Sequence, residues 1–179
     1  MGYSVGEITE KGKPYQLTVY EPDFTTPDCF KGGVFYQIFP DRFFNSGSDK
    51  GELPYGRYEV TDWSAQPVWK QDGNFPEIGQ DYYGGDLRGI EQKLPYLKSL
   101  GVTIIYLNPI FESHSNHRYN TADYFKIDPS LGTEEDFVSL CAAAKKLGIR
   151  IILDGVFSHT GDDSRYFNRY GRYGDCGAF

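Results

Sequence analysis

Short apolar runs alternate along the chain with stretches of helical periodicity. Residues 34–39, 102–107 and 149–153 are rich in β-branched and aromatic side chains and predict three strands. Between them, apolar residues three or four positions apart in 87–100 and 133–147 predict two amphipathic helices. This order of strand, helix, strand, helix, strand is typical of βαβ units around a parallel sheet. A doubly wound sheet and a (β/α)8 barrel both begin in this way.

The second predicted helix has clear capping residues, whereas the first contains a proline. Thr133 is a suitable N-cap for the second helix, three acidic residues follow it, and Gly148 ends it. The first helix stops at Gly101 but contains Pro95, which removes a backbone hydrogen bond and clashes one turn back. We therefore expect a kink there, or two short abutting helices.

The flanking segments lack this regularity. Residues 15–20 alternate like a strand and 21–28 read as a turn-rich linker, so we expect residues 1–32 to be the tail of a preceding β domain. Residues 45–83 show little periodicity, and a connection of this length in a compact domain is usually functional.

Composition narrows the function classes. The formal charge of −7 argues against a nucleic-acid partner, and no apolar run is long enough for a membrane helix. Three widely spaced cysteines suggest neither a disulfide framework nor a zinc knuckle. No signal peptide is visible, so the sequence indicates no location. Aromatic residues make up 17% of the chain, which fits sugar stacking as well as core packing.

Polar side chains follow each predicted strand, where parallel α/β folds place their chemistry. Asp41 and Arg42 follow the first strand, the loop 108–124 follows the second, and Asp154 follows the third, with Ser158 and His159 close behind. Side chains of adjacent residues in an extended backbone point to opposite faces, which argues against a serine activated by the neighbouring histidine.

These groups allow two other interpretations. Asp154, His159, His114 and His117 could ligate zinc, but no spacing typical of a zinc site organises them. A purely structural interpretation stays open, in which Asp154 forms a buried ion pair at a strand end and His159 is a hydrogen-bonded loop residue.

Five segments together resemble the α-amylase family of glycoside hydrolases, in particular its neopullulanase and cyclomaltodextrinase branch. They are residues 36–43 (YQIFPDRF), 83–90 (YGGDLRGI), 107–111 (LNPIF), 115–124 (SNHRYNTADY) and 154–159 (DGVFSH). The segments occur in the family's order and spacing. The resemblance therefore extends from about residue 33 to 161.

The resemblance implies a (β/α)8 TIM barrel that cleaves α-glucosidic bonds with retention, using two carboxylates. In the family these acids follow the fourth and fifth strands, and a third follows the seventh. Residues 33–179 are then the amino-terminal part of the catalytic barrel, an incomplete barrel of three βα units. We expect this fragment alone to be inactive, with no catalytic acid within it and no cofactor required.

The resemblance also implies roles for four residues in binding an α-glucan oligosaccharide. Tyr119 matches the tyrosine that stacks under the glucose next to the cleavage point, and His117 matches a neighbour in the same pocket. His159 matches the histidine that hydrogen-bonds the sugar's 6-hydroxyl. Asp154 matches an aspartate that organises charged groups on the barrel floor.

Calcium binding is the remaining question that the resemblance raises. Ser158 replaces the asparagine that many amylases use for calcium, and a hydroxyl is a poorer ligand. In this branch a different calcium can sit in the loop after the first strand. Asn45, Asp49 and Asp86, with the carbonyl of Gly84, are the candidate ligands for it.

Two rival interpretations remain open. The chain could be a glucan-binding module without chemistry, or a folding fragment that self-associates through unpaired edges of its strands. The sequence does not distinguish starch, pullulan and cyclodextrins as substrates, or hydrolysis from transglycosylation.

Overall fold

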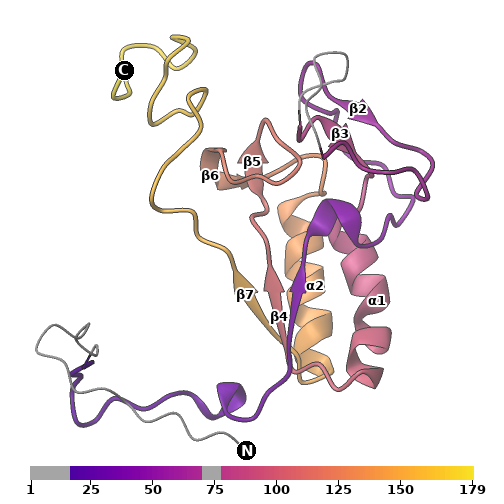
Figure 1. Ribbon diagram of the computed structural model, residues 1–179, viewed down its shortest axis with the longest axis vertical. Helices are drawn as coiled ribbons and strands as arrows, with labels where there is room; N and C mark the ends of the chain where they lie inside the picture. The colour runs from indigo at the N-terminus through magenta and orange to yellow at the C-terminus, as the bar shows by residue number, and fades with distance from the viewer. Residues whose placement is uncertain (1–16, 70–77) are drawn as a thin grey trace, which may run out of the picture.

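The computed structural model describes residues 17–69 and 78–179, and its centre is a three-stranded parallel sheet (Figure 1). The strands are β1 (Phe35–Ile38), β4 (Ile104–Leu107) and β7 (Arg150–Leu153), in the spatial order β1-β4-β7. Helix α1 (Leu87–Ser99) connects β1 to β4, and α2 (Glu134–Lys146) connects β4 to β7. The predicted order of alternating strands and helices is confirmed.

The hydrophobic core lies between the sheet and the two helices, which pack side by side against one face (Figure 1). Ile38, Leu107 and Leu153 are in register on the three strands and point to this face. The fully or nearly fully buried members of the core are Ile38, Leu87, Ile90, Leu94, Leu97, Val102, Ile105, Leu107, Ile110, Leu131, Leu140, Ala144 and Ile149.

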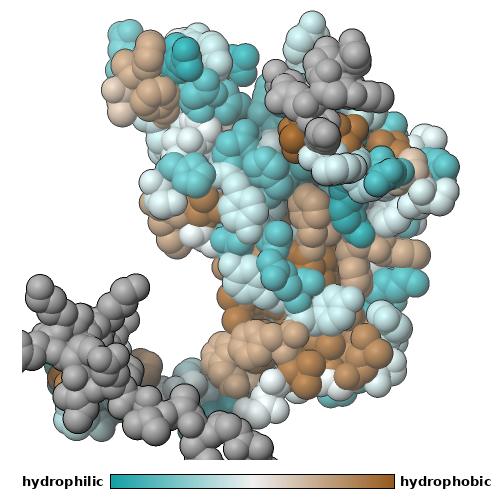
Figure 2. Space-filling view, in the orientation of Figure 1, coloured by the Kyte–Doolittle hydropathy of each residue, from teal (hydrophilic) through white to brown (hydrophobic). Residues whose placement is uncertain are grey.

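The opposite face of the sheet has a different character. Side chains alternate along a strand, so Gln37, Tyr106 and Ile152, which are in register, point away from the helices. In the view of Figure 2, apolar side chains gather at the base of the sheet, whereas polar side chains cover the ends of the strands. Phe35, at the base, is 52% exposed. The polar groups are thus concentrated at the carboxyl edge.

The helix boundaries follow local capping chemistry. Thr133 and Asp136 form a capping box at the start of α2, as the sequence suggested for Thr133. Asp86 caps α1, and its Oδ1 accepts a hydrogen bond from the Gly89 N–H at 2.6 Å. The expectation of two abutting helices is wrong, because α1 continues as one helix past Pro95.

The connections contain strands that the sequence did not predict. β2 (Tyr58–Glu59) pairs in parallel with β3 (Asp81–Tyr82) inside the segment 45–83. β5 (Phe111–Ser113) pairs antiparallel with β6 (Thr121–Ile127), so the loop after β4 is largely a hairpin. This hairpin sits above the carboxyl ends of the central strands (Figure 1).

A buried arginine fixes that hairpin. The Arg118 side chain is 1% exposed and its Nε lies 2.9 Å from Asp128 Oδ2. Its other nitrogens donate to the Asn116 carbonyl at 2.7 Å and to Ser130 Oγ at 2.6 Å. Each of the three guanidinium nitrogens therefore has a hydrogen-bond partner inside the protein.

Residues 17–34, before β1, contain turns and one short 3-10 helix but no strand. Residues 15 and 16 of the predicted strand 15–20 lie outside the described residues, and residues 17–20 form no strand. The short 3-10 helices η1 (Asp28–Phe30) and η2 (Pro40–Arg42) flank β1. Within residues 17–69 and 78–179, no helix combines the length and apolar character needed to cross a membrane.

Candidate functional site

The candidate site begins with a contact between the hairpin and the end of β7. Asp154 directly follows β7, and Tyr119 lies in the turn between β5 and β6. The Tyr119 hydroxyl donates a hydrogen bond to Asp154 Oδ2 at 2.8 Å. Among the described residues, Asp154 forms no ion pair, so this carboxylate is not the buried ion pair of the structural interpretation.

The surface around this contact is an open cavity of about 500 Å³ on the face of the sheet opposite the helices. It is lined by Phe35, Gln37, Tyr106, Tyr119 and Asp154. Sequence reasoning did not single out Gln37 and Tyr106. The segment 36–43 was the sequence signal available for Gln37, whereas Tyr106 is placed by its register with Ile152, two positions before Asp154.

Both tyrosines at the site stay protonated at neutral pH. Burial, followed by the hydrogen bond and negative charge of Asp154, raises the pKa of Tyr119 to about 12. Burial and then a hydrogen bond with Asp154 also raise the pKa of Tyr106. Asp154 therefore acts as an acceptor that faces two hydroxyl donors.

His117 stands beside Tyr119 and completes one side of the site. The two rings are stacked, with centroids 5.9 Å apart and an interplanar angle of 29°. Surrounding protein atoms, and then the positive charge of Arg118, lower the pKa of His117 below its usual value. The Tyr119 N–H donates to His117 Nδ1 at 3.1 Å, so the neutral ring carries its proton on Nε2.

His159 is not brought together with these residues. It is exposed in the loop after β7, and in the described part of the chain its ring has one polar contact, between Nδ1 and Ser158 Oγ at 2.9 Å. The expectation that these two side chains point apart is wrong, because the residues lie in a loop and not in a strand. Among the described residues the His159 ring pairs with no carboxylate, which a serine–histidine pair would need to orient it.

Asp41 and Arg42 form a polar cluster just after the carboxyl end of β1. Asp41 accepts hydrogen bonds from the N–H groups of Tyr83 at 3.1 Å and Gly84 at 3.2 Å. Arg42 bridges Asp41 and Asp81, at 3.1 Å from each. Burial raises the pKa of Asp41, although these hydrogen bonds and the arginine charges oppose the effect. The pair ties the end of β1 to the turn 83–86.

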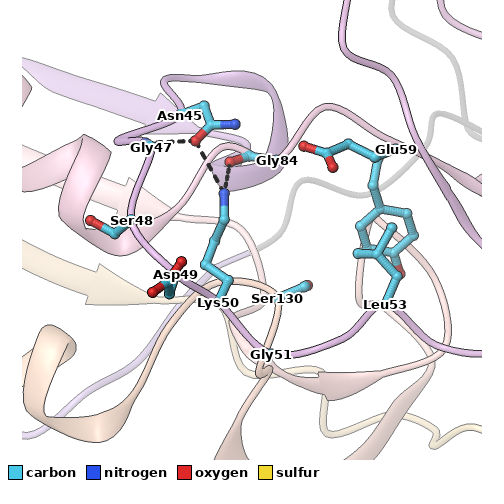
Figure 3. A pocket seen from close by; sticks show the side chains of 11 residues that line it. Asn45, Gly47, Ser48, Asp49, Lys50, Gly51, Leu53, Glu59, Gly84 and Ser130 are labelled. Carbon is cyan, nitrogen blue, oxygen red and sulfur yellow. Dashed lines mark hydrogen bonds between the residues drawn. The ribbon is translucent and has the colours of Figure 1, made fainter.

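The predicted calcium ligands are only partly gathered. Asn45, Asp49 and Gly84 line a second cavity of about 310 Å³, but Asp49 is exposed and its carboxylate lies apart from the other two (Figure 3). Asp86 is not among the residues that line this cavity, but it meets Asn45 and Gly84 beside it. The point on which the three converge is Lys50 Nζ. No group of three or more potential His, Cys, Asp or Glu ligands for a metal occurs within the described ranges.

Comparison with known proteins matches this arrangement to a family. The model of the α-amylase catalytic domain matches residues 37–176. The amylopullulanase of Thermoanaerobacterium saccharolyticum is 50% identical over 98% of this chain and 15% of its own length. Neopullulanase 2 of Thermoactinomyces vulgaris is 45% identical over 78% of the chain and 22% of its own length.

A solved structure shows the same similarity. The cyclic α-maltosyl-(1→6)-maltose hydrolase of Arthrobacter globiformis, in complex with cyclic α-maltosyl-(1→6)-maltose, has a TM-score of 0.66 and 37% identity. The match covers 84% of this chain and 32% of that one. The chain spans between 10 and 24% of the length of the curated relatives it matches.

Proposed function

The chain belongs to the family of α-amylase catalytic domains, and from this premise we propose that it forms the first three βα units of a (β/α)8 barrel that hydrolyses α-glucans. The strand order β1-β4-β7, with both helices on one face, supports this architecture because a barrel continues the same winding. The assignment of residues 1–32 to a preceding β domain stays a prediction.

The contact between Tyr119 and Asp154 carries the proposal. It places a phenol ring at the carboxyl edge of the sheet, where barrel enzymes bind their substrates. The ring offers its face to the C–H surface of a glucose unit, and Asp154 fixes the hydroxyl so that the ring is held in place. His117 Nε2–H is a donor for a sugar oxygen beside it, and the Tyr106 hydroxyl oxygen is an acceptor for a sugar hydroxyl.

The substrate class follows from the relatives. Their printed names include amylopullulanase, maltogenic amylase, neopullulanase and cyclomaltodextrinase, and we propose an α-glucan oligosaccharide for this chain. In this proposal His159 reaches the sugar from the loop after β7. That step requires the ring to turn away from Ser158 Oγ.

Bond cleavage is assigned to residues outside this chain. Retention needs two carboxylates about 5 to 5.5 Å apart across the glycosidic bond. In the proposed barrel they follow the fourth and fifth strands, while the present residues bind and orient the sugar. In this proposal, the chain by itself contributes one side of the glucan-binding site and does not cleave glucan.

Reducing-sugar release tests this division of labour. The purified chain is incubated with maltooligosaccharides, cyclodextrin and pullulan, and His159→Ala is purified in parallel to reveal contaminating amylase. We expect no release from either protein. Release by the original chain that the variant loses would mean that acids within these 179 residues carry out the reaction.

A second assay separates a hydrolase from a glucan-binding module. It uses a longer protein that contains this chain and continues the barrel. Turnover that falls on Tyr119→Ala supports the hydrolase, whereas glucan binding without turnover supports the module.

A further inference from the structure

Lys50 occupies the place where the sequence suggested a metal ion. Its Nζ donates hydrogen bonds to Asn45 Oδ1 at 3.2 Å and to the carbonyl oxygen of Gly84, and pairs with Asp86 Oδ2 at 3.1 Å. Figure 3 shows the ammonium between Asn45 and Gly84. We call these three acceptors and the ammonium the Lys50 site.

The donors and acceptors of the Lys50 site match in number. A lysine ammonium has three N–H donors and no acceptor, and here each donor has one oxygen. The Lys50 side chain is 17% exposed and that of Asp86 is 2% exposed. The charge pair is therefore largely shielded from water, which distinguishes it from the usual surface ion pair.

The Lys50 site joins segments that are far apart in the sequence. Asp86 caps α1 through Oδ1, while its Oδ2 accepts from both the N–H and the hydroxyl of Ser46 in addition to Lys50. Gly84 adopts a φ of +71°, and a Cβ there would lie 2.9 Å from Asn45 Nδ2. The loop after β1, the turn 83–86 and the start of α1 thus share one cation.

The residues present do not fit a calcium ion at this point. Calcium needs six to eight oxygen ligands, and it would have to share the space of an ammonium that carries a positive charge. Among the described residues, Asp86 is the one buried carboxylate in contact with the cation, and Asp49 is exposed. Glu59 lines the cavity but is exposed too.

We propose that Lys50 is a built-in cation that replaces calcium at the junction of the loop after β1, the turn 83–86 and α1. The fold of this region is then independent of divalent metals. The inference concerns the stability of this chain and does not depend on the proposed glucan binding.

Thermal unfolding with and without calcium tests the inference directly. We expect the Tm of the purified chain to differ by less than about 1 °C between EDTA and millimolar calcium, because the ammonium already fills the site. The variant Asp49→Asn should behave in the same way. A Tm that rises with calcium by several degrees in the original chain would overturn the proposal.

Substitution of Lys50 leaves its three oxygen acceptors without their hydrogen-bond donor. Lys50→Asp removes the cation and adds an oxygen ligand, so we expect Tm to fall by about 5 °C or more in EDTA and to recover with calcium. Lys31→Met breaks the exposed pair with Asp28 and should change Tm by less than about 2 °C. Equal small effects of both substitutions, without a calcium response, would contradict the proposal.

Amine labelling gives a readout that survives if Lys50→Asp fails to fold. Acetylation of the original chain, followed by mass spectrometry, measures the rate at each lysine. We expect Lys50 to react at least about tenfold more slowly than Lys126, whose side chain is 63% exposed, because all three Lys50 donors are engaged. Equal rates at the two lysines would show that the Lys50 ammonium is free and would overturn the inference.

Discussion

The Tyr119 hydroxyl lies 2.8 Å from Asp154 Oδ2, although 35 positions separate the two residues in the sequence. The contact joins the β5–β6 turn to the residue that follows β7. A tyrosine at the tip of a hairpin thereby becomes part of the carboxyl edge of the central sheet. One hydrogen bond thus sets the orientation of the aromatic surface to which we assign sugar binding.

The first prediction concerns the ionisation of Tyr119. Its pKa is raised to about 12, so the protonated phenol contributes stability below about pH 10 that is lost as the pH rises toward 12. In Asp154→Asn the negative charge is absent, and the pKa of Tyr119 should move down toward its usual value. Ultraviolet titration of each protein against its Tyr119→Phe counterpart isolates this group.

The same titration can contradict the prediction for Tyr119. A tyrosine that titrates near pH 10 in the original chain and disappears in Tyr119→Phe would show that Asp154 exerts no effect on it. The control is Tyr96→Phe on α1, where the side chain is 52% exposed; Asp154→Asn should change the titration of Tyr119 in this background as it does in the original chain.

The sequence predicted the elements that depend on local periodicity and capping. The apolar runs gave β4 and β7 to within two residues, and Thr133 marked the start of α2. It did not predict β6, because residues 121–127 owe their strand to pairing with β5 and to the buried Arg118 pair.

At the site, too, the sequence predicted the residues that lie in local motifs and not those brought together by long-range contacts. Tyr119, His117 and Asp154 followed from the family's motifs, and the structure brings them together. Gln37 lies within the segment 36–43 but received no role from it, and Tyr106 lies just outside the segment 107–111. Both become neighbours of Asp154 through strand register. Lys50 was missed because a lysine in a turn is ordinarily solvated, and its three acceptors come from two distant segments.

The second prediction concerns the buried Arg118–Asp128 pair. Arg118→Met should lower the free energy of unfolding by about 3–5 kcal/mol, because Asp128 would remain buried without its partner. Position 118 has a φ of 61°, which arginine and methionine, as non-glycine residues, adopt at a similar cost, so the substitution leaves the backbone strain unchanged. Urea denaturation measures the difference.

A matched control distinguishes burial from ion pairing as such. Arg88 pairs with Asp136, but the Arg88 side chain is 56% exposed. Arg88→Met should therefore lower the free energy of unfolding by less than about 1 kcal/mol. Equal losses for the two arginine variants would refute the assignment of Arg118 as the anchor of the hairpin.

The third prediction tests the capping box of α2. Thr133→Ala removes the hydroxyl that accepts from the Asp136 N–H at 3.2 Å, and should lower the free energy of unfolding by about 1 kcal/mol. Ser139→Ala, on the exposed surface of the same helix, should be neutral or slightly stabilising because alanine favours helix. Denaturant unfolding that ranks the two variants in the opposite order would rule out the cap.

The fourth prediction concerns the two sheet edges. β1 and β7 are the outer strands of the three-stranded sheet, and β7 is only partly buried. We expect the mass of the chain in light scattering to rise with concentration, and Ile152→Lys on β7 to reduce that rise. Val138→Lys on α2 should leave it unchanged. A monomer at every concentration would exclude pairing through these edges.

Calorimetric titration with maltohexaose tests the central claim, that the wall around Tyr119 binds α-glucan. We expect binding by the original chain, a dissociation constant roughly tenfold larger for Tyr119→Ala because ring stacking is lost, and no change for Tyr96→Ala. Absence of binding at millimolar sugar, or equal affinity of the Tyr119→Ala variant, would contradict the claim.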